Sequence, residues 1–206
     1  MVTTRRTYRH QPQNILKVAI LGEGGVGKTT LTKRIITGIF DSTTRMTIGV
    51  DFHLLKTSIF DPLAPEDADD VPQIDLQAQI WDFAGEERFR FMLPRYCKGA
   101  VGGALCYDLS RYSTTKFIDE WFQIWKENAP KDSPIVLVGT KADLIDNDAM
   151  PQAKENLEKL AKRLNIENWY IISAKNGRNV HILINDLLIK AYIFNYNMLK
   201  KKEQGS

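Results

Sequence analysis

The chain has 206 residues, of which 43% are hydrophobic and 26% are charged. These values are ordinary for one globular domain and exclude a disordered or fibrous protein. The net charge of +3, with basic and acidic residues interspersed, gives no support for a nucleic-acid-binding protein. Cys97 and Cys106 are too few for a disulfide framework, and no apolar stretch reaches the roughly 20 residues of a membrane span. We expect a cytoplasmic protein with two reduced, buried thiols.

Five short apolar runs follow one another along the chain, at residues 15–21, 74–81, 100–107, 134–139 and 169–173. Continuous apolar runs of this length are typical of strands buried on both faces of a parallel sheet. Helical periodicity between and after them is carried by Leu31, Ile35 and Ile36; by Phe117, Trp121, Ile124 and Trp125; by Leu157, Leu160, Ala161 and Leu164; and by Leu183, Leu187, Ala191, Phe194 and Met198. The alternation predicts an α/β fold with a mostly parallel central sheet and helices on both faces.

Residues 50–60 have the β-branched and aromatic content of a further strand, and residues 61–73 contain three prolines and five acids. We therefore predict a hairpin from Val50 to Trp81 with an irregular acidic insertion, residues 61–73, at its tip. Residues 1–13 are expected to form a flexible extension. The last predicted helix is expected to give way to a basic tail, residues 198–206, whose lysines could attract anionic lipid weakly.

The sequence GEGGVGKT, Gly22–Thr29, follows the first predicted strand and opens the first predicted helix. It matches G-x-x-x-x-G-K-[ST] in the strand–loop–helix context in which this pattern binds phosphate. Its glycines let backbone N–H groups converge on phosphates, Lys28 adds a positive charge, and the Thr29 hydroxyl can bind Mg²⁺. Asp82, at the end of a later strand, is suited to hold the same ion.

Two further motifs, TKAD at Thr140–Asp143 and SAK at Ser173–Lys175, each follow a predicted strand. Together with the phosphate loop, they make residues 14–197 resemble the Ras-like small GTPases. This resemblance implies a Ras-like G domain with the P-loop NTPase fold. It also implies that the carboxylate of Asp143 accepts two hydrogen bonds from guanine, a pair that adenine cannot offer.

The same resemblance assigns further contacts around the base. The stem of Lys141 is expected to cover the guanine ring, and the backbone of Ala174 and Lys175 to meet the guanine oxygen. Thr140 stands where most members of the family have asparagine, although some branches share the threonine. We therefore expect a weaker tie from this position to the phosphate loop, with guanine selectivity retained.

Within this superfamily the chain is most similar to Rab proteins. The similar segments are Thr47–Phe52, Ile80–Arg90, Arg95–Ala100 and Tyr107–Ser110. The resemblance implies that Phe40 packs against the guanine edge and that Thr47 and Gly85 contact the γ-phosphate. Residues 38–52 and 82–98 would then be switch loops, ordered by that phosphate and read by effectors and regulators.

The resemblance implies three overlapping sets of site residues. Contacts to GTP or GDP are expected from Glu23, Gly24, Gly25, Val26, Gly27, Lys28, Thr29, Thr30, Phe40, Thr47, Gly85, Thr140, Lys141, Asp143, Ser173, Ala174 and Lys175. Mg²⁺ is expected to bind Thr29, Thr47 and Asp82. Lys28, Thr47, Gly85 and Glu86 are expected to take part in hydrolysis.

Two positions depart from the family pattern WDTAGQE, because Phe83 replaces threonine and Glu86 replaces glutamine. Glutamine can donate to a phosphate oxygen and accept from the attacking water, whereas an ionised carboxylate only accepts and is repelled by phosphate. Glu86 could still orient water, could turn away and leave slow hydrolysis, or could leave a site that does not hydrolyse GTP. Because Lys28, Mg²⁺ and the loop backbone supply most of the charge stabilisation, we predict slow intrinsic hydrolysis.

The predicted function is that of a small GTPase that alternates between GTP and GDP states. The alternatives are a non-hydrolysing GTP-binding module and a P-loop nucleotide kinase, although the acidic hairpin tip would make a poor kinase lid. Arg45 could act as an arginine finger in cis, but it is expected to be an exposed arginine of the first switch loop, and Arg88 and Arg90 are expected to be surface or partner contacts. The prenylated C-terminal cysteines usual in Rab proteins have no counterpart here, so no lipid anchor is expected. The protein is expected in the cytoplasm, with at most peripheral membrane contact.

Overall fold

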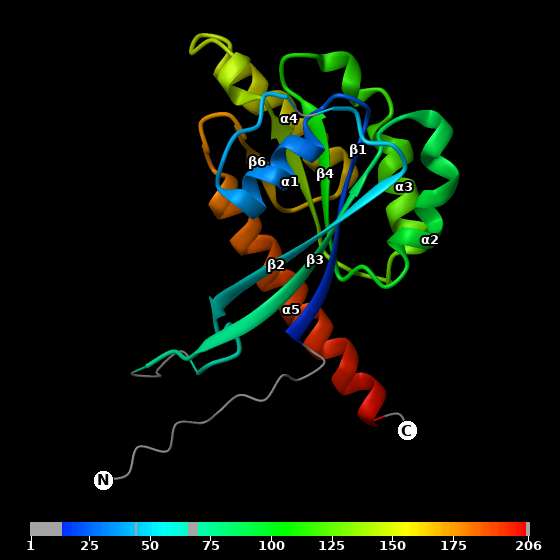
Figure 1. Ribbon diagram of the computed structural model, residues 1–206, viewed down its shortest axis with the longest axis vertical. Helices are drawn as coiled ribbons and strands as arrows, with labels where there is room; N and C mark the ends of the chain where they lie inside the picture. Colours follow the sequence, from blue (N-terminus) through cyan, green and yellow to red (C-terminus); the bar gives the residue numbers. More distant parts are fainter. Residues whose placement is uncertain (1–13, 44, 66–69, 205–206) are drawn as a thin grey trace.

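A computed structural model of the protein describes residues 14–43, 45–65 and 70–204. The predicted strands form one sheet of six, in the order β2–β3–β1–β4–β5–β6 (Figure 1). They are β1 (Ile15–Gly22), β2 (Val50–Phe60), β3 (Gln73–Phe83), β4 (Gly102–Asp108), β5 (Ile135–Thr140) and β6 (Trp169–Ile171). β2 pairs with β3 antiparallel, and the other neighbouring pairs are parallel. The predictions of a mostly parallel sheet and of the hairpin are confirmed.

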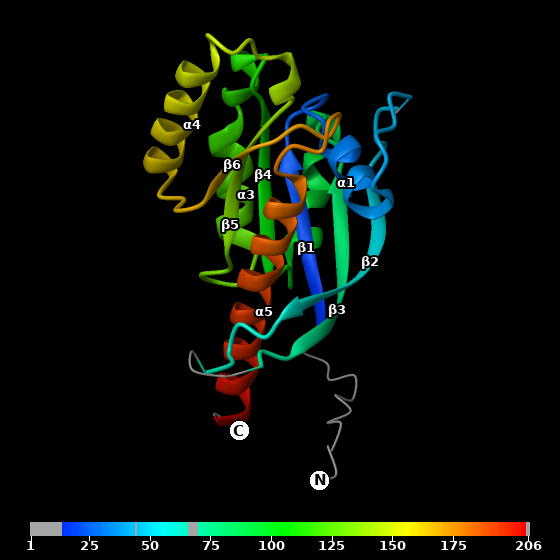
Figure 2. The same cartoon turned by 90° about the vertical axis from the view of Figure 1, so that its left-hand side faces the viewer.

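Helices cover both faces of the sheet (Figures 1 and 2). They are α1 (Lys28–Thr37), α2 (Leu93–Cys97), α3 (Ile118–Asn128), α4 (Met150–Leu164) and α5 (Val180–Gln204). Alternate side chains of β1 belong to different hydrophobic clusters, as the strand period of two requires. Leu16 and Val18 lie in the cluster with α1 and α5, whereas Ala19 and Leu21 lie in the cluster with α2, α3 and α4. Each face of the sheet therefore has its own core.

The end of β1 is held very close to β4 at Gly22. The φ angle of Gly22 is +139°, and a Cβ atom added there would lie 2.2 Å from the carbonyl oxygen of Cys106. Both the backbone conformation and the contact require glycine. We expect Gly22→Ala to lower the free energy of unfolding by about 3 kcal/mol, measured by urea denaturation.

Gly38, at the C-cap of α1, provides the control for this substitution. Its φ angle is +71°, but an added Cβ would meet nothing within 4 Å. Gly38→Ala should therefore cost only the left-handed backbone conformation, about 1 kcal/mol. Equal losses for the two variants would show that the contact with Cys106 is not the cause.

The carboxyl-terminal helix extends further than predicted. α5 continues to Gln204, so residues 198–204 of the expected basic tail are helical. Lys, Glu and Gln are good helix formers, and neither glycine nor proline interrupts this stretch. Phe194 and Met198 also pack against the core, which supports the last turns. Residues 205–206 and the predicted extension 1–13 lie outside the described residues.

Two segments that were expected to be loops are the one after β3 and the acidic insertion at residues 61–73. The segment after β3, expected as a loop, contains a 3-10 helix at Glu87–Met92 followed by α2. The acidic insertion is described except for residues 66–69, and its ends are joined by a hydrogen bond from the Asp61 N–H to the Pro72 carbonyl (2.8 Å).

The composition predicted two reduced, buried thiols and no membrane-spanning segment. Cys97 and Cys106 are free and fully buried, as predicted, and burial raises the pKa of each thiol to about 12. Among the described residues, no helix has the length and apolar character needed to cross a bilayer.

Candidate nucleotide-binding site

The predicted motifs come together beyond the carboxyl ends of the parallel strands, where open α/β sheets bind ligands. A pocket of about 460 Å³ is lined by Gly27, Thr30, Leu31, Phe40, Ser42, Thr140, Lys141, Asp143, Leu144, Ile172, Ala174 and Lys175. A second pocket of about 270 Å³ is lined by Gly24, Gly25, Gly27, Lys28, Thr29, Thr30, Arg45, Met46, Thr47, Phe83, Gly85 and Lys141. Because Gly27, Thr30 and Lys141 line both, the two pockets are parts of one cleft.

Lys28 lies at the first turn of α1, directly after the phosphate loop. Its Nζ donates to the carbonyl oxygens of Gly22 (2.8 Å) and Glu23 (2.9 Å), and the residue is only 5% exposed. Burial lowers the pKa of Lys28, while the negative charge of Asp82 opposes that shift. The loop therefore surrounds the ammonium group of Lys28, which borders the smaller pocket, as phosphate binding requires.

The residues expected to hold Mg²⁺ also meet at this pocket. The hydroxyl oxygens of Thr29 and Thr47 are 2.5 Å apart, although the residues belong to α1 and to the loop before β2. Asp82 is fully buried, and within the described parts of the chain neither carboxylate oxygen has a hydrogen-bond partner. Burial raises the pKa of Asp82, and the Thr29 hydroxyl and the Lys28 charge oppose that shift. An unpaired buried carboxylate beside two hydroxyls is the oxygen donor set that suits Mg²⁺.

The larger pocket contains the residues expected to recognise the base. The Ser173 hydroxyl donates to Asp143 Oδ1 (2.5 Å), which fixes the orientation of that carboxylate. The Thr140 hydroxyl lies 2.6 Å from the Val26 carbonyl oxygen, so threonine does tie β5 to the phosphate loop. That this tie is weaker than one from asparagine stays a prediction. Phe40 lines the same pocket from near the start of the α1–β2 connection.

Asp108 is an important residue of this site that the sequence analysis did not identify. Its side chain is 1% exposed and pairs with Lys141 (2.8 Å) and Arg111 (3.1 Å). Burial alone would raise the pKa of Asp108, but hydrogen bonds from Lys141, Ser110 and Arg111 outweigh it and lower the pKa. Lys141 Nζ also donates to the Gly25 carbonyl (2.7 Å), so its stem is held across the cleft. The sequence feature that could have identified Asp108 is its position as an acid at the carboxyl end of a buried strand.

The two departures from the family pattern have different surroundings. Phe83 is fully buried and lies near the ring of Tyr96, with 6.2 Å between centroids. Glu86 Oε2 pairs with Arg88 Nε (2.5 Å), and in the described structure Glu86 Oε1 is buried without a hydrogen-bond partner. Phe83 thus anchors the second switch loop, while one oxygen of Glu86 is occupied by a neighbouring guanidinium.

The expectation that Arg90 is a surface or partner contact was wrong. Its side chain is 16% exposed and pairs with Glu23 Oε2 (3.0 Å) and with the carboxylate of Glu120. The side chain of Glu23, expected among the nucleotide contacts, is therefore directed to the second switch loop. Arg88, by contrast, is 67% exposed, and Arg45 is exposed at the rim of the smaller pocket.

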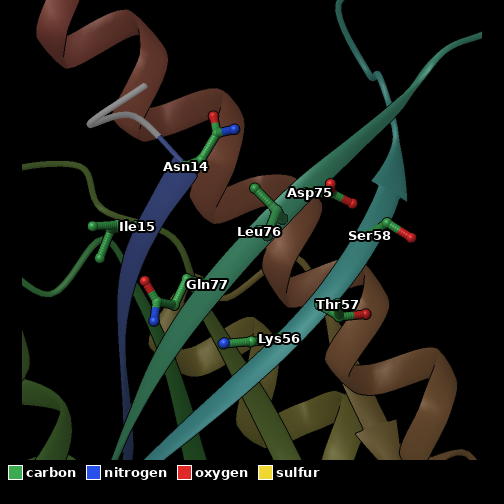
Figure 3. A pocket seen from close by; sticks show the side chains of 8 residues that line it. All are labelled: Asn14, Ile15, Lys56, Thr57, Ser58, Asp75, Leu76 and Gln77. Carbon is green, nitrogen blue, oxygen red and sulfur yellow. The ribbon is translucent and has the colours of Figure 1, made fainter. Parts of the chain in front are cut away.

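A larger pocket lies elsewhere and contains none of the motif residues. It has a volume of about 550 Å³ and lies at the start of β1, beside the β2–β3 hairpin (Figure 3). It is lined by Asn14, Ile15, Lys56, Thr57, Ser58, Asp75, Leu76 and Gln77. Volume alone therefore does not locate the candidate site in this protein.

Comparison with known proteins agrees with the geometry. The Ras family model matches residues 17–192. The Ras-related protein RABA4b of Arabidopsis thaliana is 34% identical over 196 residues, covering 93% of this chain and 77% of the relative. The Ras-related protein Rab-11A of Dictyostelium discoideum is 33% identical over 182 residues, covering 86% and 76%. The chain therefore belongs to the Ras family of GTP-binding small GTPases, close to its Rab members.

Proposed function

We propose that this protein is a switch that binds GTP or GDP with Mg²⁺ and hydrolyses GTP slowly. The observation that carries the proposal is the single cleft spanned by Lys141. One end holds a carboxylate, Asp143, suited to guanine, and the other holds Lys28 with the Thr29–Thr47 hydroxyl pair. A guanine base and its phosphates fit these two ends in that order.

Each residue has a defined task in the proposed reaction. Lys28 and the backbone N–H groups of the phosphate loop bind the β- and γ-phosphates. Thr29, Thr47 and Asp82 would hold Mg²⁺, which neutralises charge that develops on the phosphate oxygens. Water attacks the γ-phosphorus while the bond to the GDP oxygen breaks, giving GDP and phosphate. The Gly85 N–H would donate to a γ-phosphate oxygen.

Glu86 decides between the proposed function and a non-hydrolysing GTP-binding module. Its pairing with Arg88 favours the second candidate, because a carboxylate held by a guanidinium is less free to accept a hydrogen bond from water. Slow turnover is favoured by the second oxygen, Oε1, which is buried but has no hydrogen-bond partner among the described residues. A kinase is not supported, because the described ends of the acidic insertion lie at the opposite end of the sheet from the phosphate loop, where they cannot form its lid (Figure 1).

Partner binding is proposed to use the two switch loops. Large apolar side chains are exposed on both, including Ile48 at 79% and Phe91 at 78%. Exposed apolar side chains on neighbouring loops are typical of protein-binding surfaces. We propose a cytoplasmic location with weak contact between the basic end of α5, which includes Lys201 and Lys202, and anionic lipid.

Glu86→Gln is expected to increase the rate of single-turnover GTP hydrolysis about 10-fold, the effect of about one hydrogen bond in the transition state. Glutamine can donate to a γ-phosphate oxygen and is not repelled by it, whereas the carboxylate can only accept. The measurement uses protein loaded with GTP and started with Mg²⁺, with phosphate release followed over time.

Glu87→Gln is the matched control, because it removes the same charge from the adjacent, exposed residue. It should leave the rate unchanged. Turnover by the natural protein supports the switch, and turnover by Glu86→Gln alone supports the non-hydrolysing module. Both functions require selective binding of GTP, which competition of GTP and ATP for the site tests. Failure to prefer GTP would rule out both the switch and the non-hydrolysing module.

A further inference from the structure

Arg90 is enclosed by three elements although it lies in the second switch loop. Its guanidinium lies 4.9 Å from the ring centroid of Phe117 and 5.5 Å from that of Trp121, at the start of α3. Nη1 binds the carboxylate of Glu120, also on α3, and Nη2 binds Glu23 Oε2 in the phosphate loop (3.0 Å). Arg90 therefore connects the phosphate loop, the second switch loop and α3.

Its partner Glu23 occupies a central position in the phosphate loop. Glu23 Oε1 accepts a hydrogen bond from the Gly24 N–H (3.0 Å), and its carbonyl oxygen accepts one from Lys28 Nζ (2.9 Å). The same peptide is covered by Gly85, where an added Cβ would lie 2.3 Å from Glu23 C. Glu23 thus contacts both the lysine expected to bind phosphate and the glycine expected to bind the γ-phosphate.

A carboxylate in a phosphate-binding loop has an electrostatic cost. Like charges repel, and the repulsion is stronger in a partly buried site than in water. GTP adds the γ-phosphate near this loop, so an uncompensated Glu23 carboxylate would weaken GTP binding more than GDP binding. Arg90 supplies the compensating charge. It can do so only while the second switch loop lies against the phosphate loop.

We propose that Glu23, Arg90 and Glu120 form a latch that makes Arg90 a determinant of the preference for GTP over GDP. The inference rests on the proposed nucleotide switch. When the latch is closed, Arg90 offsets the charge of Glu23 and holds Gly85 against the phosphate loop. Its bond to Glu120 and its stacking on Phe117 and Trp121 carry the same state to α3.

The test compares affinities for GDP and for a non-hydrolysable GTP analogue, both with Mg²⁺, by competition against fluorescent GDP. Arg90→Gln should weaken analogue binding about 10-fold and leave GDP binding within about twofold. The double variant Glu23→Gln with Arg90→Gln should recover most of the loss, because it removes the uncompensated carboxylate. Glu23→Gln alone should bind the analogue at least as well as the natural protein, since Arg90 keeps Glu120.

Arg163→Ala is the matched control. Arg163 forms an exposed ion pair with Asp119 (2.7 Å), the residue before Glu120 on α3. The control therefore removes an arginine that pairs with α3 but not with the phosphate loop. It should change neither affinity. Equal losses for both nucleotides in Arg90→Gln, or no recovery in the double variant, would overturn the latch while leaving the nucleotide switch intact. A natural protein that binds neither nucleotide would overturn both.

Discussion

Replacing Asp143 by asparagine is expected to weaken binding of guanine nucleotides by about 100- to 10,000-fold, the loss of two hydrogen bonds to a charged group. The carboxylate, oriented by the Ser173 hydroxyl, offers two acceptor oxygens, whereas an amide replaces one of them with a donor. That donor would face the N–H groups of guanine. Xanthine carries a carbonyl where guanine carries its exocyclic amine, so the variant should bind xanthine nucleotides better than guanine nucleotides.

Competition of GDP, xanthosine diphosphate and ADP for the cleft measures this prediction. Asp146→Asn is the control, because Asp146 is an exposed acid three residues further along the chain. It should keep the affinity for GDP. If Asp143→Asn also kept its affinity for GDP, the pocket lined by Asp143 would not be the base site. The assignment of Phe40 and Lys141 to the base would then fail as well.

Replacing Gly85 by alanine should reduce GTP hydrolysis about 100-fold or more, the effect of losing one backbone donor to developing charge. An added Cβ would lie 2.3 Å from both Glu23 C and Gly24 N. These are backbone atoms that cannot rotate away, so the second switch loop must lift from the phosphate loop. GDP, which makes no γ-phosphate contact, should bind nearly as tightly as before.

Gly99→Ala is the matched control for this variant. Gly99 follows α2, has a φ angle of +77°, and an added Cβ would meet nothing within 4 Å. It should cost stability through its backbone conformation but retain turnover once folded. Single-turnover hydrolysis and GDP affinity, measured on both variants, separate the two effects. Unchanged hydrolysis in Gly85→Ala would show that close contact between the two loops is not needed for the reaction.

The match between expected and observed elements has a simple basis. Each predicted strand is a short apolar run, and such a run is unstable unless both faces are covered, which the parallel sheet provides. The phosphate loop, TKAD and SAK each follow one of these runs, so their meeting at one edge follows from parallel order alone. Asp143 and Ser173 are 30 residues apart, yet their hydrogen bond is a consequence of that order.

Other features depend on contacts that local sequence does not encode. The 3-10 helix Glu87–Met92 and α2 have too few residues for a clear helical period, and α2 is stabilised by packing against α3. Beyond Leu199 the last turn of α5 has no apolar residue, so a pattern search ends the helix early although its residues favour helix.

The sequence by itself determined the α/β architecture, the phosphate loop, the motif expected to recognise the base and the positions where the chain departs from its family. Only the tertiary structure decided what its charges do. It enclosed Arg90 between Glu23, 67 residues away, and α3, it placed Asp108 under Lys141, and it paired Glu86 with Arg88. The physical reason is that an apolar residue needs only burial, which periodicity reveals, whereas a charge needs one particular partner, and that partner is chosen by the fold.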